Sequence, residues 1–339
     1  MGRRILMMFL LLCLMGGAGA ENISPTTGMP LKTEPGMPVL VSIGHHVNKE
    51  EGKKAAGVGK GQSWGAHQAD IVYESLLHRN GSTRLAFLFH DALVNGEKVE
   101  AGPVRSVRTS HVILAQEWNA ALVYGAGVGG NAHAALGLRE LQSPNCALGE
   151  SRWHKYGRRI QHQEGRRVKA PDNLSADVSG IYTIYKEETH TKSQGIVFSE
   201  AVDEDFPVAS RIELDWGMEG FRTRFDYQNG QYLRYVEDLP AMSYLNANDL
   251  QEKQMVFANV VIQSTEYTWH PQHEWMPVFP NEGRGEARVF RGGRVIQGLW
   301  KRENGQTLLV DETGEPIALC AGKTFFVFFP SDREGFTWK

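Results

Sequence analysis

The stretch ADIVYESLLHRNGSTRLAFLFH, residues 69–90, contains two apolar runs separated by a turn signal. The runs, Ile71–Leu77 and Arg84–His90, are rich in the β-branched and aromatic residues that strands favour. Asn80-Gly81 stands between them, and this dipeptide is typical of tight turns between antiparallel strands. The stretch therefore predicts two adjacent strands, and the upstream run Val39–Ile43 predicts a third.

The residues that follow add helix signals. Ser106 is a good N-cap, and apolar residues follow it at helical spacing as far as Trp118. Ala120–Tyr124 predicts a short buried strand, and residues 131–141 predict a second helix. This strand–helix–strand–helix order favours a mixed α/β domain.

From residue 206 the pattern changes to β-hairpins. Gln228-Asn229-Gly230 and Gly292-Gly293 predict turns between apolar runs, and Met255–Thr268 predicts a long strand. We therefore expect an α+β protein. A mixed α/β domain would occupy residues 39–205, an antiparallel β-rich domain residues 206–330, and a tail residues 331–339.

The N-terminus has the pattern of a secretory signal. Arg3 and Arg4 precede an apolar run, residues 5–15, and Ala18-Gly19-Ala20 supplies a small-residue cleavage site. The run is shorter than the roughly 20 residues that span a bilayer, so we expect no integral membrane span after cleavage. The sequence therefore predicts a signal peptide over residues 1–20 and an extracytoplasmic protein, secreted or attached to the cell envelope.

Two details refine this prediction. Cys13 is a poor lipidation site because the bulky Leu12 precedes it, so cleavage after Ala20 is favoured over a lipid anchor. Residues 21–38 contain four prolines and two glycines without apolar periodicity, which predicts a linker.

Composition narrows the classes of partner. The chain has 339 residues, 41% of them hydrophobic and 22% charged, which is typical of globular proteins. Loss of two arginines with the signal would change the net charge from −3 to −5, and an acidic surface argues against nucleic acid as a partner. Cys146 and Cys320 would remain, either as a disulfide or as two thiols.

Two glycine-containing motifs match patterns of known functional sites, but the elements around them do not fit those sites. Residues 61–65 match G-x-S-x-G, but a nucleophile elbow follows a strand and precedes a helix, and here the strand comes after the motif. Gly125, Gly127 and Gly130 match G-x-G-x-x-G between a strand and a helix, but no good second strand ends near Glu150. We expect no dinucleotide and no other cofactor. The glycine loop can still offer backbone N–H groups to an anion or a sugar hydroxyl.

The histidines do not predict a metal site. They are scattered through both predicted domains, and none of them forms the H-E-x-x-H spacing by which a helix binds zinc.

Two arginines stand where a helix disfavours cations. Arg105 and Arg108 bracket the predicted helix start, where the helix dipole opposes positive charge by a few tenths of a kcal/mol up to about 1 kcal/mol. A negative group should compensate; Asp70 and Glu74 are candidates, and Arg84 opens the next strand. The arginines could form an internal network with these carboxylates. Alternatively, their guanidinium groups could bind an anion or a carbohydrate through bidentate hydrogen bonds.

Several of these stretches resemble the YerB-like family of bacterial exported proteins, the domain-of-unknown-function 3048 family. The matching stretches are Gln62-Ser63, Ala69-Asp70-Ile71-Val72-Tyr73-Glu74, Thr83-Arg84, Gly102-Pro103-Val104-Arg105-Ser106 with Arg108, Asn259-Val260-Val261-Ile262-Gln263 and Gly298-Leu299-Trp300-Lys301. The resemblance implies an N-terminal and a C-terminal family domain, export, and often a lipid anchor. It implies no established reaction.

The sequence departs from the family where the family has histidines. A His- and Gly-rich family loop corresponds here to Tyr124 and the glycine run after it, and Asp172 stands before Asn173 where relatives have histidine. A Pro-His segment of the family appears here as Pro240-Ala241. The resemblance therefore favours binding over catalysis for this chain.

Together these observations predict a binding protein of the cell envelope. The ligand would be an envelope glycan, another anion or an envelope protein. The predicted ligand-binding residues are Arg84, Arg105, Ser106, Arg108, Gly125, Gly127 and Gly130, oriented by Asp70 and Glu74. One alternative is a wall-modifying hydrolase in which Asp70 and Glu74 serve as acid and base roughly 5–9.5 Å apart. Another is a scaffold that offers edge strands of the second domain to a partner.

Overall fold

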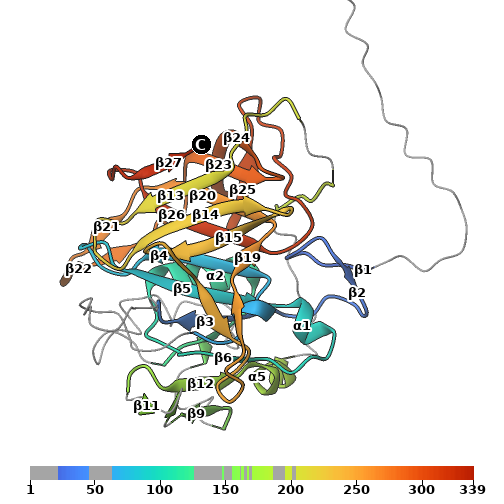
Figure 1. Ribbon diagram of the computed structural model, residues 1–339, viewed down its shortest axis with the longest axis vertical. Helices are drawn as coiled ribbons and strands as arrows, with labels where there is room; N and C mark the ends of the chain where they lie inside the picture. Colours follow the sequence, from blue (N-terminus) through green and yellow to red (C-terminus); the bar gives the residue numbers. More distant parts are fainter. Residues whose placement is uncertain are drawn as a thin grey trace, which may run out of the picture.

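The computed structural model describes residues 22–45, 63–125, 147–148, 155–160, 162–163, 166–167, 170–185, 195–200 and 204–339. Strands predominate, and one sheet of ten strands crosses the molecule (Figure 1). Its order is β25-β24-β23-β20-β26-β4-β5-β3-β7-β8. The first half of the chain supplies β3 (Val39–Ile43), β4 (Ile71–Leu76), β5 (Thr83–Phe89), β7 (Ala121–Val123) and β8 (Ala147–Leu148). The second half supplies β20 (Asn259–Thr265), β23 (Gly283–Arg291), β24 (Arg294–Glu303), β25 (Gln306–Val310) and β26 (Thr324–Pro330).

Strand β26 joins the two halves. It runs parallel to β4 on one side, with Thr324 opposite Ile71, and parallel to β20 on the other, with Thr324 opposite Asn259. Its sequence TFFVFFP is buried throughout, as expected for a central strand covered on both faces. The segments 39–205 and 206–330 therefore share one sheet.

A second sheet covers one face of the ten-stranded sheet. Its strands are β13 (Arg211–Asp215), β14 (Arg222–Gln228), β15 (Gln231–Val236), β16 (Leu239–Pro240), β19 (Val256–Phe257) and β27 (Phe336–Trp338). Phe225 of β14 and Phe257 of β19 each lie 5.0 Å from Phe325 of β26, measured between ring centroids. The expected tail, residues 331–339, thus ends in β27, which pairs with β13.

Helix α2 (Thr109–Trp118) covers the opposite face. Trp118 Nε1 donates to the hydroxyl of Tyr73 in β4 at 2.6 Å, and the hydroxyls of Ser75 and Ser110 lie 3.0 Å apart. Because side chains alternate along a strand, Tyr73 and Ser75 face α2 whereas Glu74 faces the second sheet. The order of layers is therefore helix, main sheet and second sheet.

Shorter elements complete the described part of the chain. The helices are η1 (Ala66–Gln68), α1 (Asp91–Val94) and α5 (Val178–Tyr185). The remaining strands are β1 (Asn22–Ile23) with β2 (Pro30–Leu31), β6 (Glu100–Ala101) with β12 (Leu174–Asp177) and β9 (Gly157–Arg159), β10 (His162–Gln163) with β11 (Arg166–Arg167), β17 (Met242–Tyr244) with β18 (Glu252–Gln254), and β21 (Thr268–His270) with β22 (His273–Val278).

The local turn predictions are confirmed. Asn229 and Gly230, between β14 and β15, have φ of 51° and 82°. Gly292 and Gly293, between β23 and β24, have φ of 55° and 74°. Positive φ at both central residues is the geometry of the tight hairpin turn whose twist matches its strands.

The predicted start of the main helix is wrong by two residues. Helix α2 begins at Thr109 with Arg108 as N-cap, not after Ser106. The preceding segment is held against β3 because Arg105 N donates to Ser42 O at 2.9 Å and Ser42 Oγ donates to Ser106 O at 3.0 Å. These tertiary hydrogen bonds keep the segment out of the helix.

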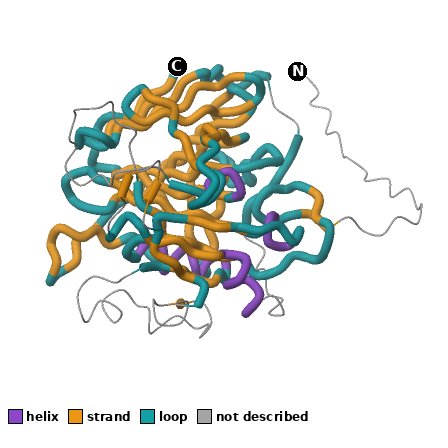
Figure 2. The backbone as a smooth tube through the Cα atoms, turned by 60° about the horizontal axis from the view of Figure 1, so that its bottom comes forward, coloured by secondary structure: helices purple, strands orange, loops and turns teal. Residues whose placement is uncertain are grey.

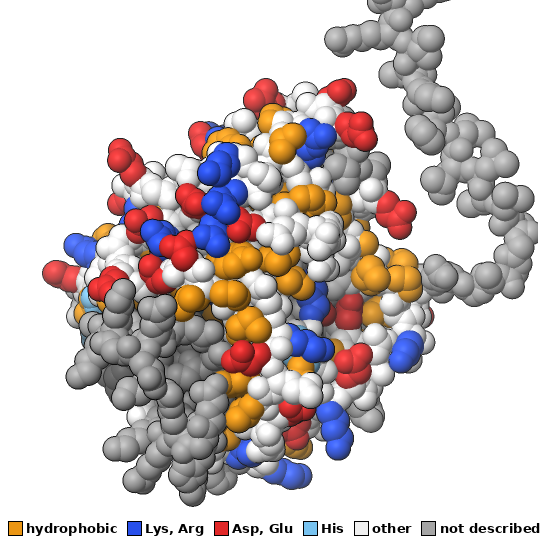
Figure 3. Space-filling model, in the orientation of Figure 1, with side chains coloured by type: hydrophobic (Ala, Val, Ile, Leu, Met, Phe, Trp, Pro, Cys, Tyr) orange, Lys and Arg blue, Asp and Glu red, His pale blue; other side chains and the backbone are white. Residues whose placement is uncertain are grey.

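The fold class is confirmed in its coarser form. The second half consists of β-sheet, largely antiparallel, but the expected α/β layering of residues 39–205 has only weak support because the helices among the described residues there are few and short (Figure 2). The predicted helix over residues 131–141 lies outside the described residues. Among the residues that the structure describes, no helix is long and apolar enough to cross a membrane. On the face shown in Figure 3, basic and acidic side chains are interspersed.

The expected linker is folded in its described part. Residues 22–23 pair with residues 30–31, and Ser24, Thr26 and Thr27 are buried. Their hydroxyl groups hydrogen-bond to carboxylates of the main body, an interaction that proline and glycine content does not reveal.

Candidate anion-binding site

Three arginines converge beneath the first turn of α2. Arg84 of β5 lies opposite Ser75 in the register of β4 and β5, and Ser75 contacts Ser110 of α2, so Arg84 occupies the face that α2 covers. Arg105 lies in the extended segment before α2, and Arg108 is the N-cap. The three arginines are therefore neighbours in space, and their role in binding a ligand stays a prediction.

The described residues supply this cluster with one carboxylate. Asp172 forms an ion pair with Arg105, and both side chains are about one-fifth exposed. Arg84 and Arg108 are only 5% and 7% exposed, and neither forms an ion pair with a described residue. Arg108 donates from Nη1 to Val107 O at 2.8 Å, whereas the buried Nε atoms of Arg84 and Arg108 have no acceptor in the described part of the chain.

The lowered pKa values of two of the arginines are consistent with an excess of positive charge in the cluster. Burial, together with repulsion by Arg105 and Arg108, holds the pKa of Arg84 well below its ordinary value, with Asp172 acting in the opposite direction. Burial and then Arg105 lower the pKa of Arg108 to about 10. Guanidinium groups stay protonated at neutral pH even so, and the positive charge is therefore retained at an energetic cost.

His111 lies next to the cluster as a neutral ring. Its Nδ1 accepts the backbone N–H of Arg108 at 2.8 Å, which places the ring proton on Nε2. Burial and the charges of Arg84 and Arg108 lower its pKa to about 3. His111 therefore adds no charge near neutral pH.

A histidine–tryptophan pair borders Arg108. The guanidinium carbon of Arg108 lies 5.5 Å from the ring centroid of Trp275 in β22, a distance that allows a cation–π interaction. The imidazole of His78 stacks on Trp275, with 5.2 Å between ring centroids. Trp275 and His78 thereby limit the positions that Arg108 can adopt.

Glu74 does not orient the arginines, contrary to the prediction. It accepts a hydrogen bond from Thr83 at 2.7 Å and pairs with Arg234 of β15 at 3.4 Å, and His45 lies 3.5 Å away. Glu74 and the residue opposite Arg84 are neighbours along β4, so their side chains point to opposite faces of the sheet. Glu74 therefore belongs to the contact between the two sheets.

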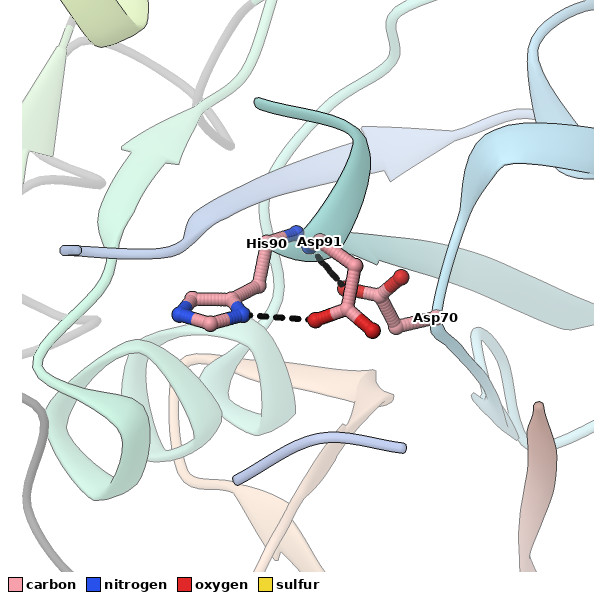
Figure 4. A group of neighbouring side chains, drawn as sticks. All are labelled: Asp70, His90 and Asp91. Atoms are coloured by element: carbon pink, nitrogen blue, oxygen red, sulfur yellow. Dashed lines mark hydrogen bonds and ion pairs between the residues drawn. The ribbon is translucent and has the colours of Figure 1, made fainter. Parts of the chain in front are cut away.

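Asp70 also lies apart from the arginines, in a group with His90 and Asp91 (Figure 4). One oxygen of Asp70 accepts the backbone N–H groups of His90 and Asp91 at 2.7 and 3.0 Å and the hydroxyl of Thr26 at 3.2 Å. Asp91 accepts hydrogen bonds from Ser24, Thr27 and the ring of His90. Asp70 therefore attaches the N-terminal segment to the sheet instead of orienting arginines.

This group is the one within the described ranges that could hold a metal ion. One ligand atom from each of Asp70, His90 and Asp91 lies within 4.8 Å of the others. However, the facing carboxylate oxygens already accept the hydrogen bonds given above, and a cation would have to displace those donors. We interpret the group as a structural hydrogen-bond network.

Asp70→Asn should reduce the dependence of stability on pH. Burial and then repulsion by Asp91 raise the pKa of Asp70 from 3.8 to about 7, although His90 and Lys323 oppose the shift. The folded protein thus holds a proton that the unfolded chain releases near its ordinary pKa. The resulting stabilisation is complete below pH 3.8 and is lost as the pH rises to about 7, by up to about 1.4 kcal/mol per pH unit.

Asparagine cannot lose this proton, so urea unfolding should give a flatter stability profile for the variant and a more stable variant at about pH 8. The exposed Asp238→Asn serves as the control, and parallel profiles for parent and Asp70→Asn would contradict the assignment.

The other predicted site residues have mixed outcomes. Gly125 is buried, and its N–H donates to Arg105 O at 3.0 Å; a Cβ there would approach Leu174 to 2.9 Å. Ser106 is half-buried beside Arg105, whereas Gly127 and Gly130 lie outside the described residues. Sequence reasoning missed the roles of Asp172, His111 and Trp275. Asp172 carried a signal, because the family resemblance implied a histidine at this position, before Asn173.

Comparisons with known proteins identify the family. The model of the N-terminal domain of the proteins of unknown function DUF3048 matches residues 57–203, and the model of the C-terminal domain matches residues 212–326. The fold is similar to the crystal structure of the YerB protein from Bacillus subtilis, with a TM-score of 0.68, 21% identity and coverage of 91% of this chain and 96% of that one. No curated protein matches the chain. Since the two family models together span most of its length, the chain belongs to the DUF3048 family.

Proposed function

We propose that this protein binds an anionic group of a cell-envelope ligand at the cluster formed by Arg84, Arg105 and Arg108. The observation that carries the proposal is the buried guanidinium group of Arg84, which has no carboxylate partner and whose Nε–H has no acceptor among the described residues. Burying a charge without a partner is costly, and a ligand anion would compensate this one. An internal network, by contrast, would pair each arginine with a carboxylate.

The place of action that we propose is the extracytoplasmic side of the membrane. The support is the sequence of residues 1–20, with its basic start, its apolar run and its small-residue end. Anionic glycans of the envelope are ligands of suitable chemistry, because guanidinium groups bind their charged groups and sugar hydroxyls through several hydrogen bonds.

The hydrolase alternative is not supported by the placement of its carboxylates. Asp70 and Glu74 are buried, and each is engaged by different protein groups: Asp70 by the N-terminal segment and Glu74 by the second sheet. Paired catalytic carboxylates would have to face one substrate. We therefore propose a binding function and do not add a hydrolase activity to it.

Anions should raise the melting temperature of the full chain. A ligand that binds only the folded state adds about 2.7 kcal/mol of stability at a concentration of 100 times its Kd. We would follow thermal unfolding with phosphate, sulfate, citrate and anionic envelope glycan fragments. The shift should be lost in Arg105→Gln and kept in Arg222→Gln, which removes an exposed, ion-paired arginine of β14. If no anion or glycan stabilises the parent, the proposal is wrong.

A further inference from the structure

The charge of the arginine cluster points to a narrower class of ligand. This step rests on the function proposed above. We infer that the bound group is a dianion, the terminal phosphate monoester of a soluble molecule such as a sugar phosphate.

The first argument is the balance of charge. Three guanidinium groups contribute three positive charges, Asp172 contributes one negative charge, and His111 is neutral near neutral pH. The described residues therefore leave two positive charges uncompensated. A phosphate monoester carries about −1.5 to −2 at neutral pH, whereas a carboxylate or a phosphodiester carries about −1. Of these groups, the monoester comes nearest to neutralising the cluster.

The second argument is the arrangement of hydrogen-bond donors. Arg84 and Arg108 hold buried Nε–H groups that no described residue accepts. The cluster also lies at the N-terminus of α2, a helix of ten residues in which the N–H groups of Thr109 and Ser110 precede the first helical hydrogen bond, from His111 N to Arg108 O. Donors of these two kinds suit the oxygens of a phosphate, which can each accept more than one hydrogen bond.

The third argument is depth. Arg84 and Arg108 are almost fully buried, so the charged group that reaches them must be a terminal group of the ligand. A monoester is terminal and presents three oxygens. A phosphodiester carries a substituent on both sides and is less able to approach buried groups, and a phosphate held at a lipid surface would have to leave that surface.

Isothermal titration of the full chain at about pH 8 tests the inference, because a phosphate monoester is then a dianion. The probes are inorganic phosphate, glucose 6-phosphate, dimethyl phosphate, acetate and vesicles that contain phosphatidic acid. Glucose 6-phosphate should bind at least tenfold more tightly than dimethyl phosphate or acetate. It should also bind when phosphatidic acid vesicles do not.

Two charge variants give a second readout. Arg84→Met lowers the net charge of the cluster and should reduce the ratio of monoester to diester affinity, whereas Asp172→Asn raises the net charge and should increase this ratio. Arg222→Gln should leave the ratio unchanged. A purely structural role of these residues would not move the ratio in opposite directions.

The outcomes separate the two proposals. If dimethyl phosphate or acetate binds as tightly as glucose 6-phosphate, the dianion inference is overturned while anion binding stands. If only the vesicles bind, the soluble source is overturned. If none of the probes binds and the glycan fragments of the unfolding experiment also have no effect, the proposed function fails as well.

Discussion

Arg84→Met should make the protein more stable and at the same time weaken its binding of anions. Methionine is similar in length to the aliphatic part of arginine and can fill the same space beneath α2. The substitution removes a charge that is 95% buried, lacks a carboxylate partner within the described residues and is repelled by Arg105 and Arg108. Replacing buried charged groups by hydrophobic ones of similar volume stabilises proteins by about 1–4 kcal/mol in favourable cases. We expect a gain in this range.

A second buried arginine provides the matched control. Arg302 is 2% exposed, close to the 5% of Arg84, but its Nη2 donates to the carboxylate of Glu117 at 2.7 Å. Arg302→Met leaves that carboxylate buried without its ion pair and should therefore destabilise the protein. Urea unfolding and titration with phosphate would be measured for both variants. A loss of stability in Arg84→Met comparable with that in Arg302→Met would show that Arg84 is structural and would remove the main support for the proposed function.

Breaking the Glu74–Arg234 pair should cause the largest loss of stability. Glu74 and Arg234 are 0% and 2% exposed, and the pair connects the main sheet to the second sheet. Removing one member leaves the other charge buried, which costs about 3–5 kcal/mol. We therefore expect Arg234→Met to destabilise strongly. Glu74→Gln should have a smaller effect, because burial raises the pKa of Glu74 and Arg234 only partly opposes this.

The double variant Glu74→Gln/Arg234→Met should recover much of the loss, since neither charge remains. Anion affinity should be unchanged in the folded variants, because Glu74 lies on the face of the sheet opposite the arginine cluster. A difference below about 1 kcal/mol for Arg234→Met would contradict the assigned role of the pair.

Local sequence patterns predicted where the strands of this protein lie better than they predicted which strands pair with each other. The hairpin of β4 and β5 follows from two apolar runs and a turn, which are close in sequence. The parallel pairing of β26 with β4 depends on residues at opposite ends of the chain, and no local signal encodes it. The prediction of an α/β domain also relied on local signals. A helix signal in a short stretch of sequence does not show how many strands will join one sheet.

The candidate site shows the same division. Arg105 and Arg108 attracted attention because cations at a helix start violate a local electrostatic preference. Asp172 comes from a distant segment, and only the folded chain shows that it pairs with Arg105. The error on Glu74 was one of register: a shift of one residue along β4 exchanges the arginine side of the sheet for the other.

The position of β26 has a consequence for how the chain folds. This strand is made after the other nine strands of the main sheet, yet it fills the gap between β4 and β20 in the middle of that sheet. Until it arrives, β4 lacks one neighbour, and the part of the sheet that the N-terminal family domain supplies is incomplete. Pairing over such long sequence separations slows folding because a large loop must close first. The two family domains are therefore expected to become native together, in a late step that follows the synthesis of β26.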